Sequence, residues 1–86
     1  MNKAVIAGYS RSPFTPAKKG ELIDVKPNKL LSEVIKNLIS KSKVNPKDIE
    51  DAIIGCAFPE GEQGFNIGKI VTFLSGLDIH TSGMTV

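Results

Sequence analysis

Hydrophobic positions in residues 27–42 repeat with the period of an amphipathic helix. They stand at i, i+4 and i+8 in two adjacent rows: Leu30, Leu31, Val34, Ile35, Leu38 and Ile39. Pro27 is compatible with the first position of a helix, whereas Asn45-Pro46 cannot continue one. The pattern therefore predicts a helix that begins at Pro27 and ends near Ser42.

Two other runs are apolar without alternation, which is typical of strands buried on both faces. The first run spans Ala4–Tyr9 and the second spans Ala52–Phe58. A third stretch with strand character, Met84–Val86, follows at the C-terminal end. The sequence therefore predicts three strands.

Two irregular segments separate these elements. Residues 11–26 are rich in proline and lysine and have no period, so they are expected to form a long surface connection. Residues 59–64 are rich in turn-forming side chains. A second, shorter amphipathic helix is predicted over residues 67–74, and Gly76 can end it. Its apolar positions are Ile67, Ile70, Val71 and Leu74.

The order strand, helix, strand, helix, strand corresponds to two successive βαβ units. Such units indicate a parallel sheet with right-handed crossovers. Two crossover helices cannot cover both faces of three strands, although the first two strands look apolar on both sides. The missing cover must come from more chain or from another subunit. We expect an α/β fold, an incomplete parallel sheet with two amphipathic helices, in which residues 1–86 are part of one domain.

Composition and charge argue against several classes of protein. The 86 residues carry eleven basic and nine acidic side chains, which gives a formal charge of +2. Arg11 is the only arginine, and the four phenylalanines and one tyrosine are scattered, so no nucleic-acid partner is expected. The longest apolar stretch is about a third of the roughly 20 residues that a transmembrane helix needs, and the N-terminal run is too short for a secretory signal. We expect a cytoplasmic protein with no membrane partner.

Cys56 and His80 are the side chains with the clearest chemical potential. Cys56 could be a nucleophile with a distant histidine, but its sequence neighbours are apolar and no cation adjoins it, which favours a packing role. His80 lies in a polar segment near Asp78 and is interpreted as a loop histidine. A lone cysteine forms no intramolecular disulfide, and this pair is too small for the usual zinc sites.

The loop Gly61–Gly64 stands before the second predicted helix, where backbone N–H groups can bind a phosphate. Glu60 and Glu62 oppose an anion there, and the glycine spacing of a P-loop is absent. Chain reversal is the favoured role, and contact with a ligand is the alternative. We therefore assign no catalytic, cofactor-binding or metal-binding residue within this sequence.

Four segments of the chain follow one another in an informative order. Ala4-Val5-Ile6 and then Arg11-Ser12-Pro13-Phe14 match the opening V-I-x-x-x-x-R-[TS]-P-[FI], and Val44–Ile49 is similar to L-x-P-x-D-[IV]. Ile54-Gly55-Cys56 with Glu62–Lys69 is similar to G-C-x-x-x-x-x-E-Q-G-x-N-[IP]-[AG]-R, and Met84–Val86 is similar to the strand before N-R-x-C-x-S-G. Together they resemble the N-terminal portion of the thiolases, the acetyl-CoA acetyltransferases and 3-ketoacyl-CoA thiolases, closest to the fatty acid degradation branch.

The resemblance implies the first βαβαβ part of a thiolase-like layered fold and a coenzyme A thioester as the substrate of the full-length family. In that family a nucleophilic cysteine follows the third strand, and a second cysteine and a histidine come from the other half. Cys56 aligns with a non-catalytic strand position, and His80 lies outside the family's Gly-His-Pro motif. Lys69 stands where the motif has arginine.

The function expected from this resemblance is that of an N-terminal fragment of a thiolase-type acyltransferase. We expect it to be inactive alone, because the nucleophilic segment would follow Val86. The alternatives are a split subunit that docks on a partner chain and a free-standing small α/β binding module. The expected partner is the remaining thiolase sequence or a partner subunit over the open sheet face, with a homo-oligomer for the full-length family. The coding sequence directly after Val86 would distinguish these readings.

Overall fold

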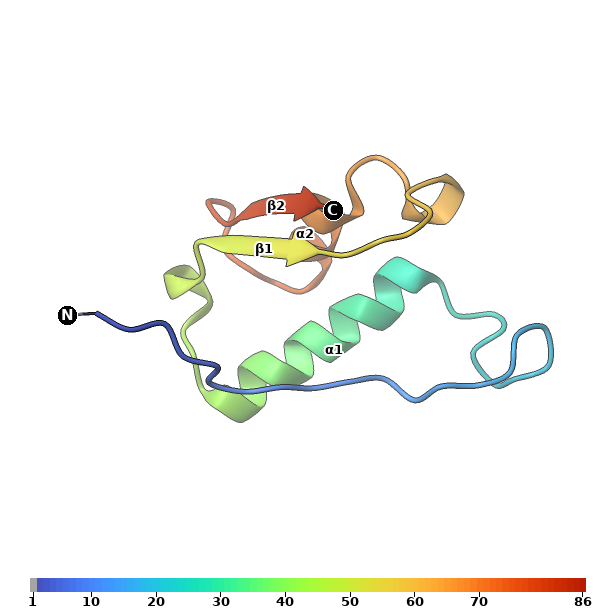
Figure 1. Cartoon of the computed structure of the whole chain (residues 1–86), viewed down its shortest axis with the longest axis horizontal. Coiled ribbons are helices and arrows are strands. Elements are labelled where there is room, and N and C mark those ends of the chain that lie inside the picture. Colours follow the sequence, from blue (N-terminus) through green and yellow to red (C-terminus); the bar gives the residue numbers. More distant parts are fainter. Residues whose placement is uncertain (1) are drawn as a thin grey trace.

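The fold is known from a computed structural model that describes residues 2–86, so Met1, which the expected domain includes, lies outside the described residues. Two α-helices, α1 (Pro27–Ser42) and α2 (Ile67–Leu74), accompany two strands, β1 (Asp51–Ile54) and β2 (Ser82–Thr85). Short 3-10 turns at Pro46–Asp48 and Gly61–Gln63 precede β1 and α2. The strands are parallel, and α2 packs against both of them and against α1 (Figure 1). The expected α/β class with parallel strands and two helices is confirmed.

Both helices lie where their periodicity predicts them. Helix α1 begins at Pro27, whose missing N–H costs nothing at a first helical position. It ends at Ser42, and Lys43 then adopts a left-handed conformation (φ 57°) while its N–H donates to the Ile39 carbonyl. Helix α2 spans the predicted residues 67–74. Local sequence is thus sufficient to place these elements.

One face of the two-stranded sheet is covered and the other is open. Residues alternate along both strands between exposed and half-buried. The half-buried residues Ala52, Ile54, Gly83 and Thr85 belong to the face against which α2 packs. On the opposite face Ile53 pairs with Met84 in register, and these side chains are 62% and 51% exposed. Helix α2 therefore covers a single face of the sheet.

Two glycines allow α2 to lie very close to β2. A Cβ atom on Gly68 would overlap the backbone carbonyl of Met84. A Cβ atom on Gly83 would lie 2.5 Å from the Lys69 Cα atom, closer than carbon atoms in proteins approach. The backbones of helix and strand are therefore in direct contact at these positions.

The buried core is small and includes polar side chains. Ile67, Val71 and Leu77 are its buried hydrophobic residues. Thr72 and Thr81 are each only 1% exposed. Their hydroxyl groups donate to the carbonyls of Lys69 (2.6 Å) and Ile49 (2.7 Å). Since no buried side-chain nitrogen or oxygen within residues 2–86 lacks a partner, these polar groups are buried without an unmet hydrogen bond.

The strand predicted over Ala4–Tyr9 is wrong. These residues have no strand pairing and run beside α1 (Figure 1). Val5 and Ile6 are 79% and 95% exposed. At the end of this segment the Tyr9 carbonyl accepts from Lys41 of α1 (3.5 Å), and the next residue, Ser10, donates its hydroxyl to Asn37 (3.0 Å). An apolar run forms a strand only when another strand offers its backbone groups, and this run lies against a helix.

The other strand boundaries differ from their predictions by a few residues. The run predicted over 52–58 forms β1 only at Asp51–Ile54, although the Cys56 N–H still donates to the Val86 carbonyl (2.8 Å). The last strand, predicted at 84–86, is Ser82–Thr85. Polar Ser82 and Gly83 do not look like strand residues, but they pair with Asp51 and Ala52. The ends of each strand are set by its backbone hydrogen bonds to the other strand. The hydrophobicity of the side chains does not indicate where those bonds begin and end.

No helix in the described part of the chain is long and apolar enough to cross a membrane.

The close packing of α2 on β2 can be tested with Gly68→Ala. Backbone atoms surround the new methyl group, so the overlap is expected to cost about 3 kcal/mol, more than the roughly 1 kcal/mol that alanine gains in helix propensity. We expect urea unfolding, followed by circular dichroism, to show a net loss of about 2 kcal/mol. The matched control is Gly55→Ala, where nothing lies within 4 Å of the added Cβ. Equal unfolding midpoints for the two variants would contradict the packing argument.

Candidate functional site

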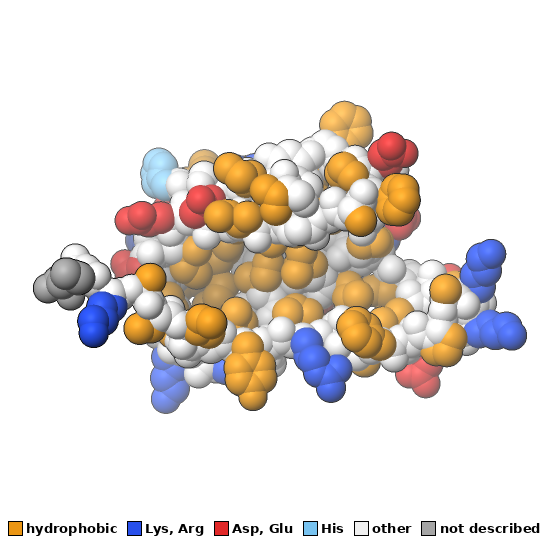
Figure 2. Space-filling view, in the orientation of Figure 1, with side chains coloured by type: hydrophobic (Ala, Val, Ile, Leu, Met, Phe, Trp, Pro, Cys, Tyr) orange, Lys and Arg blue, Asp and Glu red, His pale blue; other side chains and the backbone are white. Residues whose placement is uncertain are grey.

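The structure contains a groove of about 570 Å³. It lies between residues 5–8, the C-terminal half of α1 and the segment that leads into β1. Figure 2 shows hydrophobic side chains gathered in a hollow between the two layers of the molecule. Leu38, Ile39, Val44 and Ile49 contribute its aliphatic lining, with Asp51 at its edge. The groove is therefore mainly apolar.

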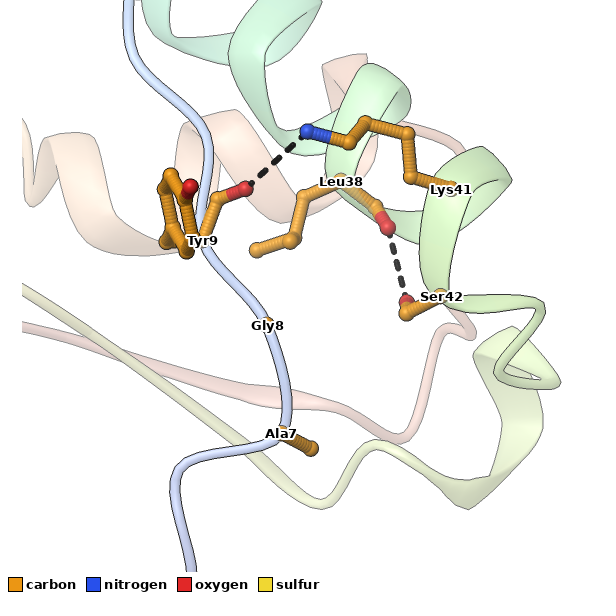
Figure 3. Close-up of a pocket in the computed structure, with 6 residues that line it drawn as sticks. All are labelled: Ala7, Gly8, Tyr9, Leu38, Lys41 and Ser42. Atoms are coloured by element: carbon orange, nitrogen blue, oxygen red, sulfur yellow. Dashed lines mark hydrogen bonds between the residues drawn. The ribbon is translucent and has the colours of Figure 1, made fainter.

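A smaller pocket of about 330 Å³ continues this groove beside α1 (Figure 3). The Lys41 ammonium lies 5.5 Å from the centre of the Tyr9 ring and donates to the Tyr9 carbonyl at 3.5 Å. The Ser42 hydroxyl donates to the Leu38 carbonyl at 2.7 Å. The Lys41 and Ser42 side chains thus bond to the protein's own backbone. The lining of the pocket offers one cation but no paired acid and base, which general acid–base chemistry would require.

The structure does not bring Cys56 and His80 together. Cys56 is half-buried just beyond the carboxyl end of β1, whereas His80 is exposed just before the amino end of β2. The strands are parallel and Asp51 pairs with Ser82, so the two side chains belong to opposite ends of the sheet. The backbone from Asp51 to Cys56 alone spans about 16 Å. Cys56 and His80 therefore do not form a nucleophile–base pair in this structure.

The loop Gly61–Gly64 is closed by its own hydrogen bonds. The Gln63 amide donates to the Phe58 carbonyl at 2.9 Å, and the Gly64 N–H donates to the Gly61 carbonyl at 3.1 Å. Gly61 has a φ of +58°, a conformation that suits glycine in a turn. Because these groups bond within the loop, the geometry favours chain reversal over the binding of a phosphate.

Asn66 connects the start of α2 to β2. Its backbone is left-handed (φ 55°), and its side-chain amide donates to the Gly83 carbonyl at 3.1 Å. The Thr85 hydroxyl donates to the Asn66 side-chain oxygen at 2.7 Å and accepts from the Gly68 N–H at 3.0 Å. A strand residue thus takes the role that a helix N-cap normally plays. Sequence reasoning missed this contact, because its residues are 17 and 19 positions apart.

The described residues contain no cluster of three or more His, Cys, Asp or Glu side chains that could hold a metal ion. The motif residues Gln63, Asn66 and Gly68 instead make contacts that shape the loop and join helix to strand. The parallel strands and the two helices define the class of this protein as an α/β fold.

Comparison with known proteins identifies the family. Residues 4–86 match the family model described as the thiolase N-terminal domain. The chain belongs to the thiolase family.

Several curated relatives align along the whole of this chain. It is 38% identical over 86 residues to a 3-ketoacyl-CoA thiolase of Bacillus subtilis (strain 168). It is 37% identical to the 3-ketoacyl-CoA thiolase of Colwellia psychrerythraea and 34% identical to that of Vibrio cholerae. In all three cases the alignment covers 100% of this chain and 22% of the relative. The chain therefore spans about a fifth of the length of these relatives.

The position of Cys56 predicts an unreactive thiol. Half-burial at the end of β1 should make its alkylation by iodoacetamide at neutral pH slower than that of a free cysteine peptide. Mass spectrometry of the folded chain measures this rate, and the same chain in denaturing urea is the control. Modification of the folded chain faster than of the peptide would show an activated thiol and contradict the packing role.

Proposed function

We propose that this chain forms the N-terminal part of a thiolase-type acyltransferase. The enzyme would act on a coenzyme A thioester, in 3-ketoacyl-CoA thiolysis or acetoacetyl-CoA formation. The observation that carries the proposal is the alignment of the whole chain with proteins named 3-ketoacyl-CoA thiolase, together with the family match over residues 4–86. We further propose fatty acid degradation in the cytoplasm as its setting.

The chain is proposed to supply scaffold to this enzyme rather than its reacting groups. Covalent acyl transfer needs a nucleophile that an adjacent base or a lowered pKa activates. The only cysteine, Cys56, lies at the opposite end of the sheet from His80. The groups that react with the thioester are therefore expected outside these residues, and the 86-residue chain alone is expected to be inactive.

The apolar side chains on the open sheet face favour the proposal that a partner covers it. Ile53, Met84 and Val86 are 62%, 51% and 65% exposed. Each large aliphatic side chain left in water forgoes about 1.5–3 kcal/mol, and small domains have only about 5–15 kcal/mol of total stability. We propose that the remaining thiolase sequence, in the same or another chain, covers this face. The greater length of the relatives supports this choice, and a homo-oligomer is proposed for the whole enzyme.

A second candidate function follows from the same open face. A free-standing α/β binding module, or a split subunit that docks on a chain carrying the cysteines, would also cover Ile53 and Met84. A split subunit restores acyl transfer when its partner chain is added, whereas a binding module does not. An assay of the 86-residue chain mixed with the remaining residues of a 3-ketoacyl-CoA thiolase, supplied as a separate chain, therefore separates these two possibilities.

The proposed function can be tested in a chimera. The 86 residues replace the matching segment of the Bacillus subtilis relative, to which they are 38% identical. We expect the chimera to thiolyse acetoacetyl-CoA in the presence of coenzyme A well above the buffer rate. The 86-residue chain alone should consume the thioester at the buffer rate, because it supplies no activated nucleophile. Loss of the enolate absorbance of acetoacetyl-CoA measures both reactions.

Two variants of the chimera act as controls. Cys56→Ser should change the rate by less than about twofold, since removal of a true nucleophile costs several orders of magnitude. Gly68→Ala should lower the amount of folded chimera, because it separates α2 from β2. A chimera that is folded but inactive would contradict the proposed function. A Cys56-dependent rate in the isolated chain would contradict its inactivity.

Assembly of the isolated chain is a separate prediction. Because its apolar face is open, we expect the 86-residue chain alone to be partly unfolded or self-associated. Residues 2–12 should exchange their amide hydrogens fastest, since they make no strand pairing. Sedimentation and hydrogen exchange measure these properties, and the chimera provides the ordered reference. A monomer with one cooperative melt and uniform protection would instead favour the free-standing module.

A further inference from the structure

Lys69, on α2, holds the turn that precedes β2. Its ammonium donates to the Thr81 carbonyl at 2.6 Å and to the Ile79 carbonyl at 3.3 Å. It also lies 4.9 Å from the centre of the Phe73 ring. Lys69 makes no ion pair with any of the described residues. Its positive charge is therefore directed to backbone carbonyls and an aromatic face.

The turn held by Lys69 connects both strands. Thr81 is only 1% exposed, and its hydroxyl donates to the Ile49 carbonyl at 2.7 Å just before β1. The next residue, Ser82, donates its N–H to the Glu50 carbonyl at 3.0 Å. Through Thr81, the ammonium on α2 is thus linked to the point where β1 and β2 begin to pair.

A cation with several donors suits this contact. An ammonium carries three N–H donors and no acceptor, so it can serve two carbonyls and still face a ring. Hydrogen bonds from charged donors are shorter and stronger than those between neutral groups. An apolar side chain of similar length, such as methionine, would leave the Ile79 and Thr81 carbonyls without these bonds.

We propose that Lys69 is a positioning residue that fixes the turn over Leu77–Thr81 and so sets the register of β2 against β1. Register matters here because a shift of one residue reverses the two faces of a strand. Gly83 would then turn outward and the Met84 side chain would meet the backbone of α2, where no room exists. This inference is independent of the proposed acyl transfer.

The test compares Lys69→Met with Lys69→Arg in the chimera with the Bacillus subtilis relative, in which this segment is expected to be ordered. Methionine keeps an aliphatic stem but removes the charge, whereas arginine keeps both charge and donors. The control is Lys36→Met, which removes an exposed lysine whose ion-pair partner is Glu33 at 3.8 Å. Amide hydrogen exchange of Ser82, Met84 and Val86 reports the pairing of β2.

We expect Lys69→Met to accelerate exchange at these three amides by about tenfold, the effect of losing one charge-assisted hydrogen bond. Lys69→Arg should restore protection, and Lys36→Met should leave it unchanged. If Lys69→Met fails to fold, a protected Lys69→Arg chimera still supports the proposal. Unchanged exchange in Lys69→Met, equal loss in Lys69→Arg, or unprotected β2 amides in the unsubstituted chimera would each overturn it.

Discussion

The direct contact between the backbones of α2 and β2 is the constraint on which the rest of this structure depends. Gly68 and Gly83 lack the side chains that would separate the two elements. This contact brings the N-terminus of α2 within hydrogen-bond reach of Thr85 and places Lys69 over the turn before β2. It also leaves α2 on a single face of the sheet, which explains why Ile53 and Met84 remain exposed.

Hydrogen bonds of polar side chains help to hold the helix and strands together, because the hydrophobic core is small. Few hydrophobic residues are fully buried, and buried Thr72 and Thr81 bond to backbone carbonyls instead. Such bonds are directional, so they restrict the relative position of helix and strand more than apolar packing does. The motif residues that align with thiolases, Asn66 and Gly68 among them, contribute to these contacts. Their spacing is thus explained by the geometry of the fold.

Membership of the thiolase family and the arrangement of the described residues support a structural role for this chain, with the reacting groups outside it. The chain carries a parallel α/β scaffold with one open face, and it spans about 22% of the length of its curated relatives. Its cysteine and its histidine lie at opposite ends of the sheet. The scaffold is therefore proposed to position segments that it does not itself contain, which fits the placement of its exposed apolar side chains.

The sequence by itself determined the features that depend on residues close together along the chain. The periodicity of residues 27–42 and 67–74 was sufficient for both helices, because helical hydrogen bonds join residues four apart. Four motifs in order were sufficient for the family. Only the tertiary structure decided that Ala4–Tyr9 forms no strand, that Ser82 begins one, and that Lys69 binds the turn before it. A strand exists only through a partner, and the contacts of Lys69 and Thr81 join residues 10 to 32 positions apart, which no local pattern encodes.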